Sequence, residues 1–553
     1  MKYRLSHPVL WGAVFACINL FFWYLIDGFR VIPVDMLDGR LIVAIHEHWY
    51  QVFSGRVGWK DIPQFWPLEG TLGFSDAFFL TSIPYSIARG LGADLYFSFM
   101  VMLLGIALIG YFSCYRLFAT LFKFPKILSI FLSYLFLNTS LTHNAIAHSH
   151  PQLLIIWLLP LLILFLHAAF YGTGLLSMLL SVVSGLWLGL LFLTGYYISW
   201  YFIFFTSLAF LFWIIFQGFA QRLKPPSLER PFASFWRTMA ERKVFVKLGL
   251  MMAFGGLSLI PFFHLYLPIN VQYGERVWGE MRLIVPSFKE FFNQGTYNWM
   301  WSGLVQSLGW FSDKWPQARS MGFGPLFFAL FVLCSGTVLC SKYRNNQGSE
   351  HILLVCVLIC TILCCLCLNF RVGEVTLWKY MYQWVPGATA ISFFHRLNFI
   401  LLLPCLTIIG WALREVVWNP QNRIFGCCLG ILVILEQQPS RVSDYAMRYH
   451  EAVSRTVHVQ PPPPEAAVFY LRSSTKSEKW QFSQLDALFV AQQYGLRTVN
   501  GYSGIYPKNW WLYDPSESWY PQEVRRWIHL NGAQPSGLYE LDWDTGRWTS
   551  GGG

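Results

Sequence analysis

Long apolar runs joined by short polar connections constrain this chain more than any other feature. Of its 553 residues, 55% are hydrophobic and only 12% are charged, whereas soluble domains carry roughly 25% charged residues. A membrane-spanning helix needs about 20 predominantly apolar residues. Eleven segments approach this length: 9–26, 95–115, 127–143, 152–170, 175–194, 197–217, 246–267, 322–341, 351–369, 393–413 and 424–437. The sequence therefore predicts an α-helical polytopic membrane protein with about eleven spans.

The basic residues concentrate in alternate connections between these runs. The charge-rich connections are 1–8, 116–126, 171–174, 218–245, 342–350 and 414–423. Because cytoplasmic loops carry an excess of Lys and Arg, we expect a cytoplasmic N-terminus and, after an odd number of spans, an extracytoplasmic C-terminal region. The net charge of +11 is thus a topology signal, and no nucleic-acid partner is expected. The first apolar run lacks a clear cleavage site and is interpreted as a retained anchor.

The chain divides into a transmembrane domain, residues 1–437, and a C-terminal domain, residues 438–553. The transmembrane domain has a first outer loop, 27–94, and a second large outer loop, 268–321. The proline run Gln460–Pro464 is typical of a stiff spacer. Short alternating segments follow it, with helices expected near 476–494 and 520–531. They predict a small α+β extracytoplasmic domain.

Acidic residues gather in the first outer loop. Asp35 and Asp38 follow the first span, and a carboxylate at the lipid boundary can act as a general base for an acceptor hydroxyl; the alternative is a solvated loop that caps the span. Leu41–Phe53 has the apolar periodicity of a helix lying on the membrane surface. Glu47 in that helix is a ligand of a divalent cation, an acceptor-orienting group, a base or part of a polar face. Asp76 either completes the site or caps the next helix.

Basic and imidazole side chains recur at the outer ends of other spans. Six of them are candidates for binding a lipid-linked phosphate, with Arg40 of the first loop as a seventh: Arg371, Lys379, His395, Arg396, His148 and His150. An arginine within the first turns of a span is costly unless it meets an anion. The alternatives are snorkelling to lipid headgroups and, for the two His148-x-His150 imidazoles, capping of two spans.

Metal and nucleotide motifs are missing from the sequence. The run of five cysteines between Cys356 and Cys367 lies inside an apolar segment, where cysteine is a buried hydrophobe, so no metal site is expected. No P-loop, dinucleotide fingerprint, nucleophile elbow or zincin helix occurs. Any donor substrate is therefore expected to come from the membrane.

One span, an acidic outer loop with a short helix, many further spans and a C-terminal domain resemble the GT-C superfamily of integral membrane glycosyltransferases. The segment Asp35-x-x-Asp38-x-Arg40 is similar to the acidic first-loop motif of that superfamily. A wider pattern is also similar to uncharacterised bacterial membrane proteins: Asp38-Gly-Arg40, Glu47-His48-Trp49, Gly73-Phe-Ser-Asp76, His148-x-His150-Pro-Gln152, Pro386-Gly387, Arg396, Asn500-Gly-Tyr-Ser-Gly504 and Pro507-x-Asn-Trp510.

The resemblance implies transfer of a sugar from a polyprenyl-phosphate donor to an acceptor hydroxyl at the outer face of the membrane. Asp38 is the expected base, with Asp35 as the alternative, and Arg396 is expected to stabilise the leaving phosphate. No cofactor is required, and a divalent cation is optional. The acceptor is a lipid, a glycan or a protein. The rival hypotheses are a transporter of lipid-linked oligosaccharides and a non-catalytic scaffold for envelope assembly.

Overall fold

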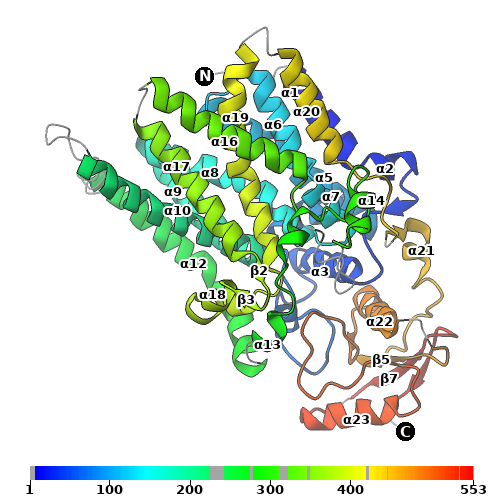
Figure 1. The fold of residues 1–553 in the computed structure, drawn as a ribbon. Helices are drawn as coiled ribbons and strands as arrows, with labels where there is room; N and C mark the ends of the chain where they lie inside the picture. Colours follow the sequence, from blue (N-terminus) through cyan, green and yellow to red (C-terminus); the bar gives the residue numbers. More distant parts are fainter. Residues whose placement is uncertain are drawn as a thin grey trace.

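The computed structural model describes residues 7–223, 242–273, 278–310, 320, 322–345, 349–418, 423–444, 446–476, 479–534 and 536–551. Figure 1 shows a bundle of long helices, with the N-terminus at one end and the C-terminal elements at the other. The bundle helices are α1 His7–Leu20, α2 Phe22–Ile26, α5 Leu95–Arg116, α6 Lys126–Leu137, α8 Leu159–Tyr171, α9 Gly174–Thr194, α10 Tyr196–Leu223, α12 Arg242–Tyr273, α16 Pro325–Asn345, α17 Ser349–Leu368, α19 Asn398–Trp418 and α20 Arg423–Glu436.

Six of the eleven predicted spans coincide with helices long and apolar enough to cross a membrane. In the described part of the chain these are Leu95–Leu121, Pro151–Tyr171, Gly174–Thr194, Tyr196–Gly218, Lys243–Gln272 and Phe394–Arg414. Four more predictions coincide with shorter apolar helices: His7–Leu20, Pro325–Cys340, Leu353–Leu368 and Ile424–Glu436. The prediction of a helical protein with several apolar spans is confirmed, and the count of eleven is met only in part.

The predicted span 127–143 is divided in two. Helix α6 ends at Leu137, and a second helix, α7 Ser140–Ala147, begins after Thr139. The hydroxyl of Thr139 accepts a hydrogen bond from the backbone N–H of Thr142, which is the geometry of a helix N-cap. The segment therefore turns before it reaches the length of a span.

Short elements lie at the end of the bundle that faces the C-terminal region. The helices are α3 Asp38–Phe53, α4 Phe79–Gly90, α13 Trp278–Met281, α14 Ser302–Ser307 and α18 Trp378–Trp384, with 3-10 turns η1 Thr71–Phe74, η3 Pro151–Leu158, η4 Phe288–Phe292, η5 Ala388–Ala390 and η6 Phe394–Leu397. A π-turn, η2 Leu117–Leu121, instead continues the C-terminal end of α5. Two small antiparallel pairs accompany them: β1 Val31–Ile32 with β4 Met447–Arg448, and β2 Arg371–Val372 with β3 Val375–Thr376.

The C-terminal region contains a four-stranded sheet with strand order β6-β5-β7-β8. Its strands are β5 Val468–Arg472, β6 Arg497–Thr498, β7 Leu538–Asp542 and β8 Arg547–Ser550, and its helices are α21 Tyr449–Ser454, α22 Trp480–Tyr494 and α23 Tyr520–Leu530. Strand β5 is parallel to β6 and β7, and β8 is antiparallel to β7. Helices α22 and α23 coincide with the two helices predicted from the sequence.

Helix α3 is formed as the periodicity predicts, but its polar face is not open to solvent. Its residues from Gly39 to Trp49 are all buried, including His46, Glu47 and His48. Helix α4 packs against it, and so does α22 of the C-terminal region. The position of α3 along a membrane surface stays a prediction, and the polar face that we expected to be solvated is covered by protein.

The first outer loop and the C-terminal region share backbone hydrogen bonds. Phe65 N–H donates to Asn500 O at 2.9 Å, and Thr498 N–H donates to Pro63 O at 3.2 Å. Phe65 and Phe74 of the loop belong to one apolar cluster with Trp510 and Tyr520. Segments more than 400 residues apart in sequence therefore form one packed unit beside the bundle.

A buried ion cluster joins this unit to α3. Arg40 Nη2 lies 2.6 Å from Asp486 Oδ1, and Arg455 Nη2 lies 2.5 Å from Asp486 Oδ2. The Arg40 and Asp486 side chains are 1% and 0% exposed. Breaking such a pair by removing one partner leaves an uncompensated buried charge, which costs about 3–5 kcal/mol.

We predict that Asp486→Asn lowers the free energy of unfolding by about 3–5 kcal/mol, because Arg40 and Arg455 then repel each other without a counterion. Thermal unfolding and limited proteolysis of the purified protein in detergent measure the effect. Asp444→Asn is the matched control, since its ion pair with Arg441 is 61% exposed on both sides and surface pairs contribute little. Equal unfolding midpoints for the two variants would contradict the prediction.

Candidate functional site

The carboxylate of Asp35 holds the start of helix α3. Its Oδ1 accepts hydrogen bonds from the backbone N–H groups of Leu37 at 3.1 Å and Gly39 at 2.7 Å. The backbone N–H of Asp35 donates to Ser149 Oγ at 2.6 Å. Ser149 follows α7, so this contact fixes the first outer loop against the segment that carries His148 and His150.

Asp38 lies beside Asp35 at the exposed first turn of α3. Its Oδ1 accepts a hydrogen bond from the Tyr502 hydroxyl at 2.7 Å, and Tyr502 comes from the C-terminal region. Asp35 is half-buried, and this burial, followed by the negative charge of Asp38, raises the pKa of Asp35 to about 7. The hydrogen bonds from Gly39 and Leu37 and the charge of Lys479 act in the opposite direction.

Burial therefore raises the proton affinity of Asp35, whereas Asp38 is exposed. A carboxyl group with a pKa near the working pH is partly ionised and still basic enough to take a proton efficiently. Two titratable groups whose environments differ in this way are a common signature of acid–base chemistry.

Four basic side chains form a buried cluster that we call the cation cluster: His148, His150, His395 and Arg396. All four are at most 9% exposed. Burial lowers the pKa of His148 to about 4 and, together with the charges of Arg396, His148 and His395, lowers the pKa of His150 well below its usual value. These two imidazoles are neutral at pH 7, so each has a ring N–H to donate.

Arg396 carries the permanent charge of the cation cluster. Its guanidinium lies 4.8 Å from the centre of the Tyr197 ring and 4.7 Å from that of the Phe393 ring. Its Nε atom is buried and makes no hydrogen bond within the described part of the chain. A guanidinium held between aromatic rings and lacking a full set of hydrogen bonds is well suited to bind an anion such as a phosphate.

Asp76 faces this cluster from the first outer loop. Its Oδ1 accepts a hydrogen bond from the backbone N–H of Tyr196 at 3.1 Å, the first residue of α10. Burial raises the pKa of Asp76, while the Tyr196 N–H and the charge of Arg396 lower it. Asp76 thus caps α10, a helix distant in sequence, and not the helix that follows it.

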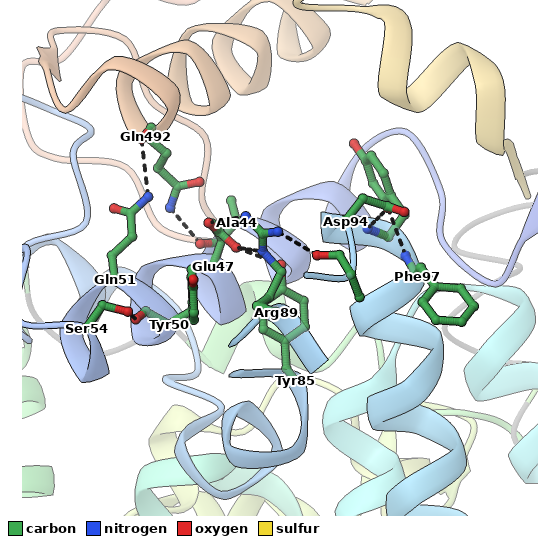
Figure 2. Close-up of polar contacts among 12 residues, drawn as sticks. Ala44, Glu47, Tyr50, Gln51, Ser54, Tyr85, Arg89, Asp94, Phe97 and Gln492 are labelled. Carbon is green, nitrogen blue, oxygen red and sulfur yellow. Dashed lines mark hydrogen bonds and ion pairs between the residues drawn. The ribbon is translucent and has the colours of Figure 1, made fainter. Parts of the chain in front are cut away.

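Two of the predicted site residues are engaged elsewhere. Arg40 pairs with Asp486 in the buried ion cluster. Figure 2 shows Glu47 clamped by Arg89, with Nε at 2.7 Å and Nη2 at 3.0 Å from its two carboxylate oxygens. Tyr85 also donates to Glu47 at 3.1 Å. By accepting three hydrogen bonds from two residues of α4, the Glu47 carboxylate stabilises the packing of α3 on α4.

Lys379 and Arg371 lie on the segment that precedes the cation cluster. Lys379 is exposed on α18, and the backbone N–H of Arg371 donates to Pro286 O at 2.9 Å. The described contacts of these two residues do not include Arg396. The cation cluster therefore consists of four of the seven basic residues expected to bind phosphate.

Several site residues were not identified from sequence. Tyr502, Ser149 and Tyr197 are the contacts of Asp38, Asp35 and Arg396, respectively. Only Tyr502 carried a signal, because it lies in the Asn500–Gly504 turn motif that the sequence pattern singled out.

A metal site is not evident. Within the described residues, no group of three or more His, Cys, Asp or Glu side chains is arranged to hold a metal ion. The pair His148-x-His150 contributes its imidazoles to the cation cluster, and no chemical step is assigned to a metal here.

Among solved structures, eight chains match this chain. No protein-family model and no curated protein matches the chain. A crystal structure of the Archaeoglobus fulgidus oligosaccharyltransferase in complex with Zn and sulfate is 14% identical over 96% of this chain and 67% of that chain, with a TM-score of 0.41. A likeness at this level carries no argument about activity.

We predict that Gly39→Ala destabilises the protein by about 1–3 kcal/mol. A Cβ at this position would lie 2.5 Å from Val34 Cγ1, 2.8 Å from Ser149 Oγ and 3.1 Å from Asp35 Oδ1, so the α3 cap must shift. Gly90→Ala is the control, because a Cβ there meets nothing within 4 Å. A thermal unfolding midpoint of Gly39→Ala at or above that of wild type would count against this close approach.

Proposed function

We propose that this protein is a membrane glycosyltransferase that moves a sugar from a polyprenyl-phosphate donor to an acceptor hydroxyl at the outer face of a bacterial inner membrane. The observation that carries the proposal is the hydrogen bond from the Asp35 backbone N–H to Ser149 Oγ. It holds the Asp35–Asp38 pair against the segment that carries His148 and His150 of the cation cluster. A base and an anion-binding group on the two sides of one site are what displacement of a phosphate leaving group requires.

In the proposed step, the acceptor oxygen attacks the anomeric carbon while the bond from that carbon to the phosphate oxygen breaks. The acceptor proton passes to a carboxylate, and polyprenyl phosphate departs with the bonding electron pair. Asp35 is favoured as the proton acceptor, because its pKa of about 7 suits a base at neutral pH. Asp38, which accepts from Tyr502, keeps that pKa high through its charge.

The leaving phosphate gains negative charge as the bond breaks. Arg396 would meet that charge with its guanidinium, and the neutral imidazoles of His148 and His150 would donate ring N–H groups. Interactions that strengthen with developing charge lower the activation barrier and contribute more than uniform binding does. Asp76 would hold Arg396 in position through its opposite charge.

The lipid-linked donor and the proposed topology fit the distribution of apolar helices. Six described helices are long enough to cross a membrane, and the carboxylate pair lies where the bundle meets the C-terminal region (Figure 1). A polyprenyl chain would remain in the lipid while its phosphate reaches the cation cluster. The N-terminus would be cytoplasmic, and the packed unit formed by the first outer loop and the C-terminal region would face outward and contact the acceptor.

We predict that Asp35→Asn lowers the transfer rate about 10²–10⁴-fold, because an amide cannot take the acceptor proton. Asp38→Asn should cost less, since it removes a neighbouring charge that raises the pKa of Asp35 and leaves the proton acceptor in place. The measurement is release of polyprenyl phosphate by purified full-length protein in lipid, incubated with a panel of polyprenyl-phosphate sugars and membrane-extract acceptors. A larger loss in Asp38→Asn would return the role of base to Asp38, and release unaffected by either change would exclude the pair.

The pH dependence of the transfer rate supplies the control for the assignment of Asp35 as the proton acceptor. Wild-type transfer should fall as pH drops below about 7, because Asp35 becomes protonated. Removing the negative charge of Asp38 lowers the pKa of Asp35, so the acid limb of Asp38→Asn should move to lower pH. An acid limb that stays in place would show that another group titrates.

We predict that Arg396→Gln lowers the transfer rate about 10²–10³-fold, because the departing phosphate loses its permanent counter-charge. Lys379→Gln is the matched control, since Lys379 is exposed on α18 and should leave the rate unchanged. Steady-state rates at saturating donor distinguish loss of chemistry from loss of binding. Equal rates in the two variants would remove Arg396 from the mechanism.

A further inference from the structure

A small cavity lies along helix α7, which leads into the segment that carries His148 and His150. Its volume is about 30 Å³, more than the roughly 10–15 Å³ that one water-sized group occupies. Ser140, His143, Asn144 and Ala147 of α7 line it. These positions follow the i, i+3, i+4, i+7 spacing of one helical face, so a single face of α7 forms one wall.

Two buried polar atoms on this wall make no hydrogen bond within the described part of the chain. They are Ser140 Oγ and His143 Nε2, and their residues are 3% and 8% exposed. A buried polar group without a partner costs about 1–3 kcal/mol. Such groups are normally paired with protein, water or ligand. The two atoms therefore point to a hydroxyl-sized guest that both donates and accepts.

Hydrogen-bonded amide side chains form another part of the cavity wall. Gln437 Oε1 accepts from Ser140 N–H at 2.9 Å, and Asn144 Nδ2 donates to Gln294 O at 2.7 Å and to Ser320 O at 2.6 Å. Because these amides are already paired, they hold Ser140 and Asn144 in place, and His143 lies between these two residues on α7. A guest would meet a preorganised site, which reduces the entropy lost on binding.

The other walls indicate the chemical class of the guest. Trp23, Tyr24 and Tyr297 contribute aromatic surface, and no carboxylate is among the described residues that line the cavity. Its one cation, Arg441, is paired with Asp444 at 2.5 Å. A nearly neutral cavity with aromatic walls and free hydroxyl partners suits a sugar, which has an apolar C–H face and a hydroxyl edge.

The cavity also adjoins the proposed active site. The ring centres of Tyr297 and His148 are 6.1 Å apart, and α7 runs directly into the His148–His150 segment of the cation cluster. We propose that this cavity binds one hydroxyl or hydroxymethyl group of a carbohydrate, through Ser140 and His143, as a sugar subsite next to the cation cluster. The proposal rests on the proposed function for its biological meaning, but its binding chemistry is testable without turnover.

The test measures binding of methyl α-D-mannoside, methyl α-D-glucoside and methyl N-acetyl-α-D-glucosaminide to full-length protein in lipid nanodiscs by saturation-transfer NMR. At least one glycoside should bind saturably, and its deoxy analogue lacking the recognised hydroxyl should not. Ser140→Ala and His143→Leu should each weaken binding at least about tenfold, as expected for one lost hydrogen bond. His143→Gln, which can still form hydrogen bonds, should restore most of the affinity.

His450→Leu is the matched control, because His450 is exposed on α21 and should leave binding unchanged. If His143→Leu fails to fold, Ser140→Ala still decides, since it removes a single oxygen. No saturable binding by wild type, or binding unaffected by Ser140→Ala and His143→Leu, would show that the cavity holds water only and would overturn the proposal.

Repeating the titration with a short-chain citronellyl-phosphate sugar distinguishes the source of the guest. If Ser140→Ala and His143→Leu weaken binding of the donor analogue but not of the free glycoside, relative to wild type, the subsite belongs to the donor. If they weaken binding of the free glycoside but not of the donor analogue, it belongs to the acceptor. The subsite and the proposed function fail separately. Glycoside binding that depends on His143 without any transfer would leave the subsite standing, whereas Asp35-dependent transfer with unchanged glycoside binding would leave only the enzyme.

Discussion

The buried pairing of Arg40 with Asp486 is the interaction on which the rest of the structure depends. It places a guanidinium and a carboxylate out of contact with water at the junction of α3 and α22. Desolvated charges are tolerated only when both partners are present, so the first outer loop and the C-terminal region adopt one relative position. That position brings the Tyr502 hydroxyl to Asp38. The geometry of the carboxylate pair thus depends on an ion pair that lies outside it.

The carboxylate pair shows that burial, and not residue type, gives two aspartates different environments. Asp35 and Asp38 are three residues apart, yet one is half-buried under the α3 cap and the other is exposed at the first turn. Desolvation penalises the charged form of the buried member, and the neighbouring charge adds to that penalty. Similar reasoning applies to the cation cluster, where His148 and His150 lose their charge through burial while Arg396 retains its own.

Local sequence pattern predicted much of the secondary structure and few of the contacts between polar side chains. Apolar run length identified the long helices. Helical periodicity identified α22 and α23, and alternation identified strands of the C-terminal sheet. Turn chemistry at Thr139 divided a run that length alone assigned to one span. The partners of Arg40, Glu47 and Asp76 were out of reach, because Asp486 and Tyr196 are 446 and 120 residues away and Arg89 lies on a different helix. Sequence periodicity shows that a face is apolar, but the position of α22 decides which polar residues are covered.

Formation of the site from both ends of the chain has a consequence for biogenesis. During synthesis, Asp35 and Asp38 are made hundreds of residues before Asp486 and Tyr502. Until then Arg40 lacks the Asp486 counterion and α3 lacks the cover of α22, so the early chain holds the two carboxylates without their final arrangement. Any activity that depends on this arrangement begins only after the C-terminal region has been made and has packed on α3.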